Sequence, residues 1–194
     1  MQKNIIMREI LQIKVSLKGS KPLIWRRFLV PNDITFLELS NIILATMGWL
    51  GGHLSSFEVG NRLTIDVPSP FDVADFLMGD LNAKDVIVKE YLNQKGDKIT
   101  YIYDFGDDWQ HTLLVEKVLP YDSSMKYPVC LKGRRSCPPD DCGGIWGYSD
   151  LLATIADKDH PEHEEIMEWV GEDFDPDHFD VADVNARYQH RFFS

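Results

Sequence analysis

The residues best suited to chemistry lie in one short acidic stretch that ends in a histidine, Asp104-Phe105-Gly106-Asp107-Asp108-Trp109-Gln110-His111. Carboxylates and an imidazole crowded together can bind a divalent cation or transfer protons. The candidate catalytic residues are therefore Asp104, Asp107, Asp108 and His111. A tight turn uses the same residue types, with Trp109 anchoring it in the core, and we favour this structural interpretation over the catalytic one.

The three cysteines form a second candidate group, Cys130-x6-Cys137-x4-Cys142. Zinc binds thiolates and imidazoles in tetrahedral sets, and such a site would order a loop that buries little apolar surface. The short C-x2-C spacing typical of zinc sites is missing, so a fourth ligand must come from elsewhere, with His111, His53 and His160 as candidates. The candidate cofactor is zinc, with the ligands Cys130, Cys137, Cys142 and His111. The alternative is that the thiols are packed and reduced.

The composition restricts the choice of partner. The chain has 194 residues and a formal net charge of -11. Nucleic acids attract proteins through Lys and Arg, so this field favours a basic protein or a cationic ligand over nucleic acid. A local basic group near the candidate cysteines could still bind DNA; it consists of Lys132, Arg134 and Arg135. A solvent-exposed loop explains these residues better.

The N-terminal residues 1–8 contain no apolar run of signal-peptide length. No stretch approaches the roughly 18 consecutive apolar residues of a membrane span. An odd number of cysteines in a chain without an export signal suits a reducing compartment. We therefore expect a cytoplasmic protein that has no membrane partner.

Alternation of apolar and polar residues predicts the elements that must position these groups. Residues 11–17 alternate, and residues 24–30 form a second β-rich run, so together they predict a hairpin. Thr35 and Glu38 form a capping-box pattern before a helix that we expect to end at Gly48. A hairpin, a short loop and a capped helix in this order resemble the opening of a ubiquitin-like β-grasp.

Two further hairpins are predicted. One joins residues 54–59 to 62–67, and the other joins 99–105 to 113–118 across the acidic turn. The remaining expectations are a weak helical turn over 71–78, a short strand over 87–92, irregular structure over 120–147, helices beginning at Ser149 and Pro161, and a last helix over 181–188.

No repeat, low-complexity run or linker divides the chain, so residues 1–194 are predicted to form a single domain. The predicted fold class is α+β, with a mixed or antiparallel sheet of hairpins and helices packed on it.

Several long motifs resemble one known family. They are Leu17-Lys18-Gly19-Ser20-Lys21-Pro22-Leu23-Ile24-Trp25-Arg26-Arg27, Met47-Gly48-Trp49 with His53-Leu54-x-x-Phe57, Tyr103-Asp104-Phe105-Gly106-Asp107-Asp108-Trp109-x-His111, Cys137-Pro138-Pro139-Asp140-Asp141-Cys142-Gly143-Gly144-Ile145-Trp146-Gly147-Tyr148 and Trp169-Val170-Gly171-x-Asp173-Phe174-Asp175-Pro176. Over residues 8–188 the chain resembles the Ri-plasmid ORF-three-like proteins. The resemblance implies a family that is generally uncharacterised, some members of which are labelled insertion-element passenger proteins similar to a resolvase. The acidic composition gives that label little support.

Three functions follow from these patterns. The leading hypothesis is a non-enzymatic binding or interaction domain whose site is built from residues 101–148, where aromatic residues stand beside acidic turns. The first alternative is a metal-dependent, phosphodiesterase-like hydrolase that uses Asp104, Asp107, Asp108 and His111. The second alternative is a DNA-handling accessory protein associated with mobile elements.

Overall fold

The computed structural model describes residues 8–60, 62–68 and 79–193. Its centre is an eight-stranded sheet with the strand order β5-β4-β3-β6-β7-β1-β2-β8. Neighbouring strands are antiparallel except β4 and β5, which are parallel. The strands are β1 (Glu9–Leu17), β2 (Trp25–Pro31), β3 (Ser55–Val59), β4 (Leu63–Val67), β5 (Leu81–Asn82), β6 (Lys98–Tyr103), β7 (Trp109–Pro120) and β8 (Val129–Arg134).

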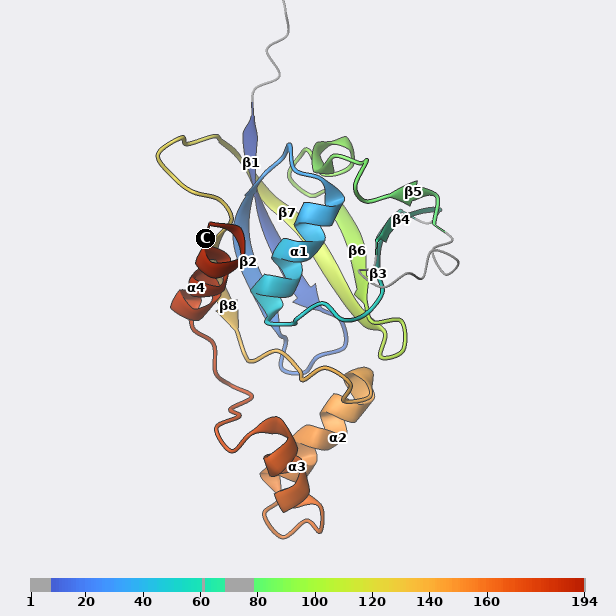
Figure 1. Ribbon diagram of the computed structural model, residues 1–194, viewed down its shortest axis with the longest axis vertical. Helices are drawn as coiled ribbons and strands as arrows, with labels where there is room; N and C mark the ends of the chain where they lie inside the picture. The colour runs from blue at the N-terminus through green and yellow to red at the C-terminus, as the bar shows by residue number, and fades with distance from the viewer. Residues whose placement is uncertain (1–7, 61, 69–78, 194) are drawn as a thin grey trace, which may run out of the picture.

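Helices cover one face of this sheet and one of its ends. They are α1 (Phe36–Met47), α2 (Gly144–Ala156), α3 (His163–Val170) and α4 (Val181–Phe192), with a 3-10 turn, η2, at Val88–Glu90. Helix α1 crosses the middle of the sheet, and α4 lies beside α1 and against β8, while α2 and α3 pack on each other beyond the sheet's lower end (Figure 1). The predicted α+β class is confirmed. None of the described helices is long and apolar enough to cross a bilayer.

The first hairpin and the helix after it form as predicted. In β1, Leu11, Ile13, Val15 and Leu17 are completely buried, because every second residue of a strand points to the same side. Thr35 and Glu38 cap α1 reciprocally, and Gly48 ends the helix in the left-handed region at φ 111°. The second neighbour of β1 is β7, in antiparallel register, so the likeness to a β-grasp is limited to the order of the first three elements.

The other two hairpins are also confirmed as β3–β4 and β6–β7, the second across the acidic turn. The helical turn predicted over 71–78 lies outside the described residues. The strand predicted over 87–92 is wrong. Those residues form η2 instead, and Ile87 makes only an isolated bridge to Thr35.

The stretch predicted to be irregular, 120–147, contains β8 and the start of α2. A bulge opposite β2 adds one residue to β8 and breaks the alternation that would have revealed the strand. Helix α2 begins at Gly144 rather than Ser149, because Gly143 and Gly144 have positive φ and turn the chain into the helix. The helix expected from Pro161 begins at His163, and the last helix extends to Phe192.

Candidate functional site

Three segments that lie far apart in the sequence meet around the side chain of Trp49. This buried indole follows α1, and its ring packs against Tyr103 at 4.9 Å and Trp109 at 5.8 Å between centroids. Its Nε1 donates a hydrogen bond of 3.0 Å to the carbonyl oxygen of Pro138. The loop after α1, the β6–β7 hairpin and the cysteine-containing loop before α2 therefore converge at one end of the sheet.

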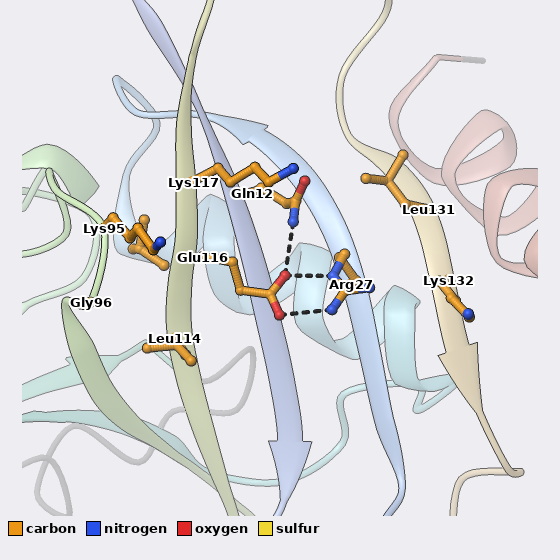
Figure 2. Close-up of a pocket in the computed structure, with 10 residues that line it drawn as sticks. Gln12, Arg27, Lys95, Gly96, Leu114, Glu116, Lys117, Leu131 and Lys132 are labelled. Carbon is orange, nitrogen blue, oxygen red and sulfur yellow. Dashed lines mark hydrogen bonds and ion pairs between the residues drawn. The ribbon is translucent and has the colours of Figure 1, made fainter.

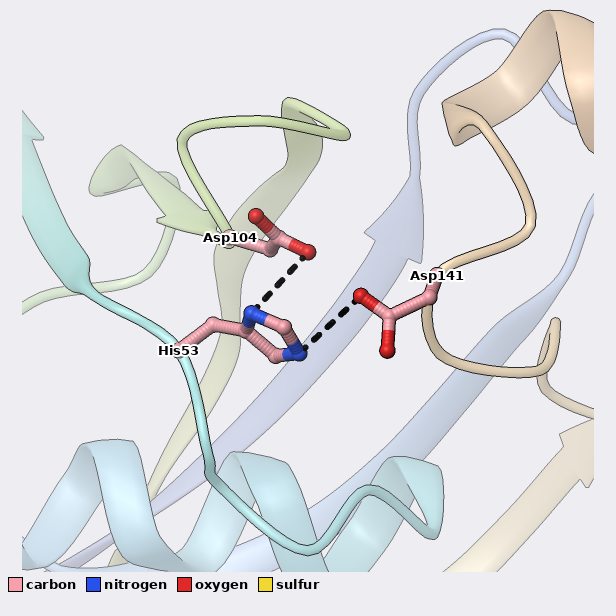
Figure 3. A group of neighbouring side chains, drawn as sticks. All are labelled: His53, Asp104 and Asp141. Carbon is pink, nitrogen blue, oxygen red and sulfur yellow. Dashed lines mark ion pairs between the residues drawn. The ribbon is translucent and has the colours of Figure 1, made fainter.

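At this junction, His53 lies between two carboxylates (Figure 3). Its Nδ1 is 3.3 Å from Oδ2 of Asp104, and its Nε2 is 3.5 Å from Oδ1 of Asp141. One ligand atom from each of the three residues lies within 4.8 Å of the other two, which is close enough for the three to bind one metal ion. The three residues come from different segments: His53 from the α1–β3 loop, Asp104 from the end of β6, and Asp141 from the loop before α2.

Asp104 is held in place by its own turn. Its backbone is left-handed at φ 58°, a region that Asp tolerates because its short side chain bonds locally. Oδ1 accepts hydrogen bonds from the backbone N–H groups of Gly106 at 2.9 Å and Asp107 at 3.4 Å. With Oδ1 occupied, Oδ2 is the oxygen that faces His53. The residue is 7% exposed, so its carboxylate is held in a largely dry position.

Asp141 is positioned by contact between the two loops. It also has a left-handed backbone, at φ 59°. Two residues later, the N–H of Gly143 donates to Oδ2 of Asp107 at 3.1 Å. A Cβ added at Gly144 would lie 2.3 Å from the carbonyl oxygen of Asp107, so only glycine permits this approach. The acidic turn and the start of α2 are thus locked together, which brings Asp141 to His53.

A third carboxylate, Asp140, and the hydroxyl of Tyr103 border the group. Burial raises the pKa of Asp140; His53 opposes this shift, while Asp141 and Asp104 add to it. Burial and then the neighbouring Asp140 also raise the pKa of Tyr103. Oδ1 of Asp140 and the Tyr103 hydroxyl are both buried, and the Tyr103 side chain interacts with the Asp140 carboxylate. The border of the group therefore places a buried carboxylate oxygen beside a buried hydroxyl.

Of the four candidate catalytic residues, only Asp104 belongs to this group. Asp107 bonds to Gly143, and both carboxylate oxygens of Asp108 accept from Nε2 of Gln110 at 3.1 and 2.9 Å. His111 is completely buried between the rings of Trp49 and Tyr101. Burial lowers its pKa to about 4, so it is a neutral core residue at pH 7.

The structure does not gather the predicted zinc ligands Cys130, Cys137, Cys142 and His111. Among the residues that the structure describes, the group of neighbouring side chains that could hold a metal ion is His53, Asp104 and Asp141, and it contains no cysteine. Cys130 is on β8 and His111 on β7, and these strands are separated by β1 and β2, a span of about 14 Å at the usual strand spacing. Burial raises the pKa of Cys130 to about 11 and of Cys142 to about 12, which favours protonated thiols.

Sequence reasoning missed His53 as a partner of the acidic turn, although it named His53 as a spare zinc ligand. Asp141 was not singled out either, although it lies in one of the long motifs. The signal available was that His53, Asp104 and Asp141 each stand in a different motif of the same family resemblance. That pattern suggests residues that act together, but it does not show that they touch.

Fold and site together define an α+β domain in which a mostly antiparallel sheet carries helices on one face and a His/Asp group at one end. Residues 9–183 match the plasmid pRiA4b ORF-3-like protein family, and the chain belongs to this family. The resemblance seen in the sequence motifs is thereby confirmed.

Two relatives extend this result. The chain is 32% identical over 163 residues to the uncharacterized protein y4hQ of Sinorhizobium fredii (strain NBRC 101917 / NGR234), covering 84% of this chain and 81% of that protein. It is also similar to the crystal structure of MM3350, a protein of unknown function from Methanosarcina mazei Go1, with a TM-score of 0.79 and 36% identity over 91% of this chain and 98% of that one. Family membership therefore establishes the fold, and any activity has to be inferred from the site.

Proposed function

We propose that the chain is a binding domain whose recognition site holds a cation at His53, Asp104 and Asp141. The observation that carries this proposal is the convergence of the three side chains, with one ligand atom from each within 4.8 Å of the others. Two of the three residues adopt the left-handed backbone, at φ 58° and 59°. Aspartate tolerates this conformation better than most non-glycine residues do, and left-handed backbones cluster at functional sites.

The chemistry of the donors narrows the kind of cation. An imidazole nitrogen with carboxylate oxygens is a mixed set that suits Zn²⁺ or Mn²⁺ better than Ca²⁺, which prefers oxygen alone. Both ring nitrogens of His53 face a carboxylate. A metal ion bound to either nitrogen would take the place of a proton on that nitrogen. The side chains of His53 and Asp141 are 30% and 74% exposed, so a bound ion would keep positions open to a partner.

The surroundings favour binding over catalysis. Two large apolar side chains near the group in sequence point to solvent: Leu50 is 89% exposed and Phe105 47%. Phe105 directly follows Asp104, and Leu50 precedes His53 by three residues. Aromatic and aliphatic anchors around a polar centre are typical of protein recognition sites. A partner that offers a ligand atom or a basic side chain to the site would bury these anchors.

Isothermal titration of the chelator-treated protein with Zn²⁺, Mn²⁺ and Mg²⁺ tests the proposal. We expect one ion per chain, with Zn²⁺ or Mn²⁺ bound more tightly than Mg²⁺. The substitution Asp141→Asn removes an exposed ligand without disturbing the core and should weaken binding at least tenfold. Asp108→Asn is the matched control, because this acid lies in the same turn but outside the group. Equal binding by the two variants, or none by the parent protein, would refute the cation site.

A metal-dependent hydrolase is a second candidate function, now with His53, Asp104 and Asp141 in place of the acidic turn and His111. The favouring observation is the position of Asp140, a half-buried carboxylate next to Asp141 at the border of the group, where it could transfer a proton to or from a bound substrate. Phosphodiester substrates offered with Mn²⁺ test this function. Turnover that disappears in Asp140→Asn while the ion still binds would support hydrolysis. If the protein binds the ion but does not hydrolyse these substrates, the hydrolase function is excluded and the binding-domain function is retained.

The third function is a DNA-handling accessory protein. The basic group predicted from the sequence supports it less well than the His/Asp group supports a cation site. Arg135 is buried, and its guanidinium is 2.5 Å from a carboxylate oxygen of Asp177, so it is not free for phosphate. Lys132 and Arg134 remain exposed on β8. This function predicts a salt-sensitive shift of duplex DNA, and no shift at low salt would exclude it.

A further inference from the structure

The face of the sheet opposite α1 contains a shallow cleft of about 670 Å³ (Figure 2). Its lining includes four basic side chains and one carboxylate: Arg27, Lys95, Lys117, Lys132 and Glu116. The cleft is therefore positively charged, although the chain as a whole has a net charge of -11. This positive charge indicates an anionic partner for this face.

Two β-bulges shape the cleft. On one side Gln12 pairs with Lys117 and Ile13 with Val115, so Glu116 is the extra residue of β7. On the other side Arg27 pairs with Lys132 and Phe28 with Cys130, so Leu131 is the extra residue of β8. Bulges re-aim side chains and are frequent next to binding sites. Here the first bulge directs Glu116 to Arg27, which it holds by hydrogen bonds of 2.5 and 2.8 Å.

The strand register places three cations in a row across this face. Lys14 on β1 is opposite Arg27 on β2, and Arg27 is opposite Lys132 on β8. Like charges directly opposite each other destabilise a sheet. Glu116 compensates Arg27, but neither Lys14 nor Lys132 forms an ion pair with any residue in the described part of the chain. The row therefore retains two positive charges that a bound polyanion would neutralise.

An aromatic ring lies beside the row. Trp25 precedes Arg27 by two residues on the same strand, so both side chains point to the same face. The ammonium of Lys14 is 5.0 Å from the ring centroid, and the guanidinium carbon of Arg27 is 5.2 Å from it. Trp25 is half-buried and pairs with Arg134 on β8, which adds a further cation.

We propose that this open sheet face binds a single-stranded nucleic acid, with phosphates on Lys14 and Lys132, the two uncompensated cations of the row, and a base against Trp25. A row of cations with an adjacent aromatic ring is the arrangement that recognises an unpaired strand, because every base offers a face for stacking. An acidic peptide would use the cations but would leave the ring without a matching group. The surface is separate from the His/Asp group, so the proposal is independent of the cation site.

Fluorescence anisotropy with labelled 20-nucleotide dT and U oligomers in 50 mM NaCl tests the proposal and separates DNA from RNA. We expect affinity to fall steeply with salt. The double substitution Lys14→Gln/Lys132→Gln should weaken binding at least tenfold and make the slope of log K against log salt shallower by about 1.4, about 0.7 for each lost phosphate contact. Trp25→Leu should weaken binding about fivefold or more. The charge-matched control is Lys84→Gln/Lys158→Gln, two exposed lysines outside the cleft.

Several results would overturn the proposal. They are the absence of binding by the parent protein in 50 mM NaCl, an equal loss in the control variant, and competition by poly-glutamate as effective as that by unlabelled oligomer. The last result would assign the face to acidic polypeptides. Duplex DNA of the same length should compete at least tenfold less well than the single strand, and equal competition would also contradict the proposal. Circular dichroism of each variant confirms that the fold is retained.

Discussion

Asp107 accepts a hydrogen bond of 3.1 Å from the backbone N–H of Gly143, which joins the β6–β7 turn to the start of α2. One residue further on, Gly144 touches the Asp107 carbonyl so closely that no side chain fits between the two backbones. Asp104 and Asp141 stand on these two segments. The contact between turn and helix therefore sets the distance between the carboxylates that face His53.

The substitution Gly144→Ala should break this contact. A Cβ at this position would lie 2.3 Å from the Asp107 carbonyl oxygen, on a backbone with φ +67°. We expect a loss of about 3 kcal/mol or more in the free energy of unfolding, measured in urea, because steric overlap adds to conformational strain. Gly171→Ala is the matched control, since Gly171 has φ +94° but no neighbour within 4 Å. It should cost only about 1 kcal/mol. Equal costs at the two glycines would mean that the turn–helix contact contributes nothing.

How far the site could be predicted from sequence depends on how local each part is. Asp104 was found because its acidic turn is visible in a few residues. His53 and Asp141 reach it through long-range contacts. These include the hydrogen bond from Trp49 to the carbonyl oxygen of Pro138, 89 positions away, and that from Gly143 to Asp107. No spacing rule encodes such a contact, because it is produced by the whole arrangement of loops at the sheet end.

The same distinction explains the fold. The alternation of β1 and the capping box of α1 are local patterns, and both formed as predicted. Strand β8 was missed because the bulge at Leu131 interrupts its period of two. The zinc prediction found no geometric support for a related reason. Cys130 lies on β8 and the other two cysteines lie in the loop after it, and the spacing of cysteines in the sequence does not show how such a loop is folded.

The pH dependence of stability should contain a contribution from His111. Burial lowers its pKa from 6.5 to about 4, so the unfolded chain binds a proton that the folded chain excludes between these values. Stability should therefore decrease as pH falls from about 6.5 to about 4, by up to roughly 3 kcal/mol at about 1.4 kcal/mol per pKa unit. Urea unfolding of His111→Phe across this range should show a shallower decrease. An exposed control, His178→Gln, should behave like the parent protein.

The cysteines should react slowly in the folded protein. Burial raises the pKa of the Cys130 thiol to about 11 and of the Cys142 thiol to about 12, so few thiolates form at pH 8. With Ellman's reagent we expect the native protein to react at least tenfold more slowly than the same protein in urea, where all three thiols become accessible. Addition of EDTA should leave the native rate unchanged. An acceleration by EDTA would show that a metal ion protects the thiols and would restore the cysteine site.

Gly133 provides the most demanding test of packing outside the site. The guanidinium carbon of Arg26 lies 4.4 Å from the centroid of the Phe179 ring, and a Cβ on Gly133 would lie 2.7 Å from the Arg26 side chain and 2.5 Å from that ring. Arg26 is 2% exposed, and its guanidinium donates to the backbone carbonyl oxygens of Trp25 and Arg134, so it has little freedom to move aside.

Gly133→Ala should therefore cost about 1–3 kcal/mol of unfolding free energy by overpacking. Phe179→Ala alone should also destabilise, because it exposes one face of a buried cation and removes a cation–π contact. Combined, the two substitutions should cost less than the sum of their separate effects, since the missing ring provides the space that the new methyl group requires. A double-mutant cycle tests this, in which the free energies of unfolding of the parent, both single variants and the double variant are measured in urea. Strictly additive costs would show that Gly133 is required by something other than the Arg26–Phe179 stack.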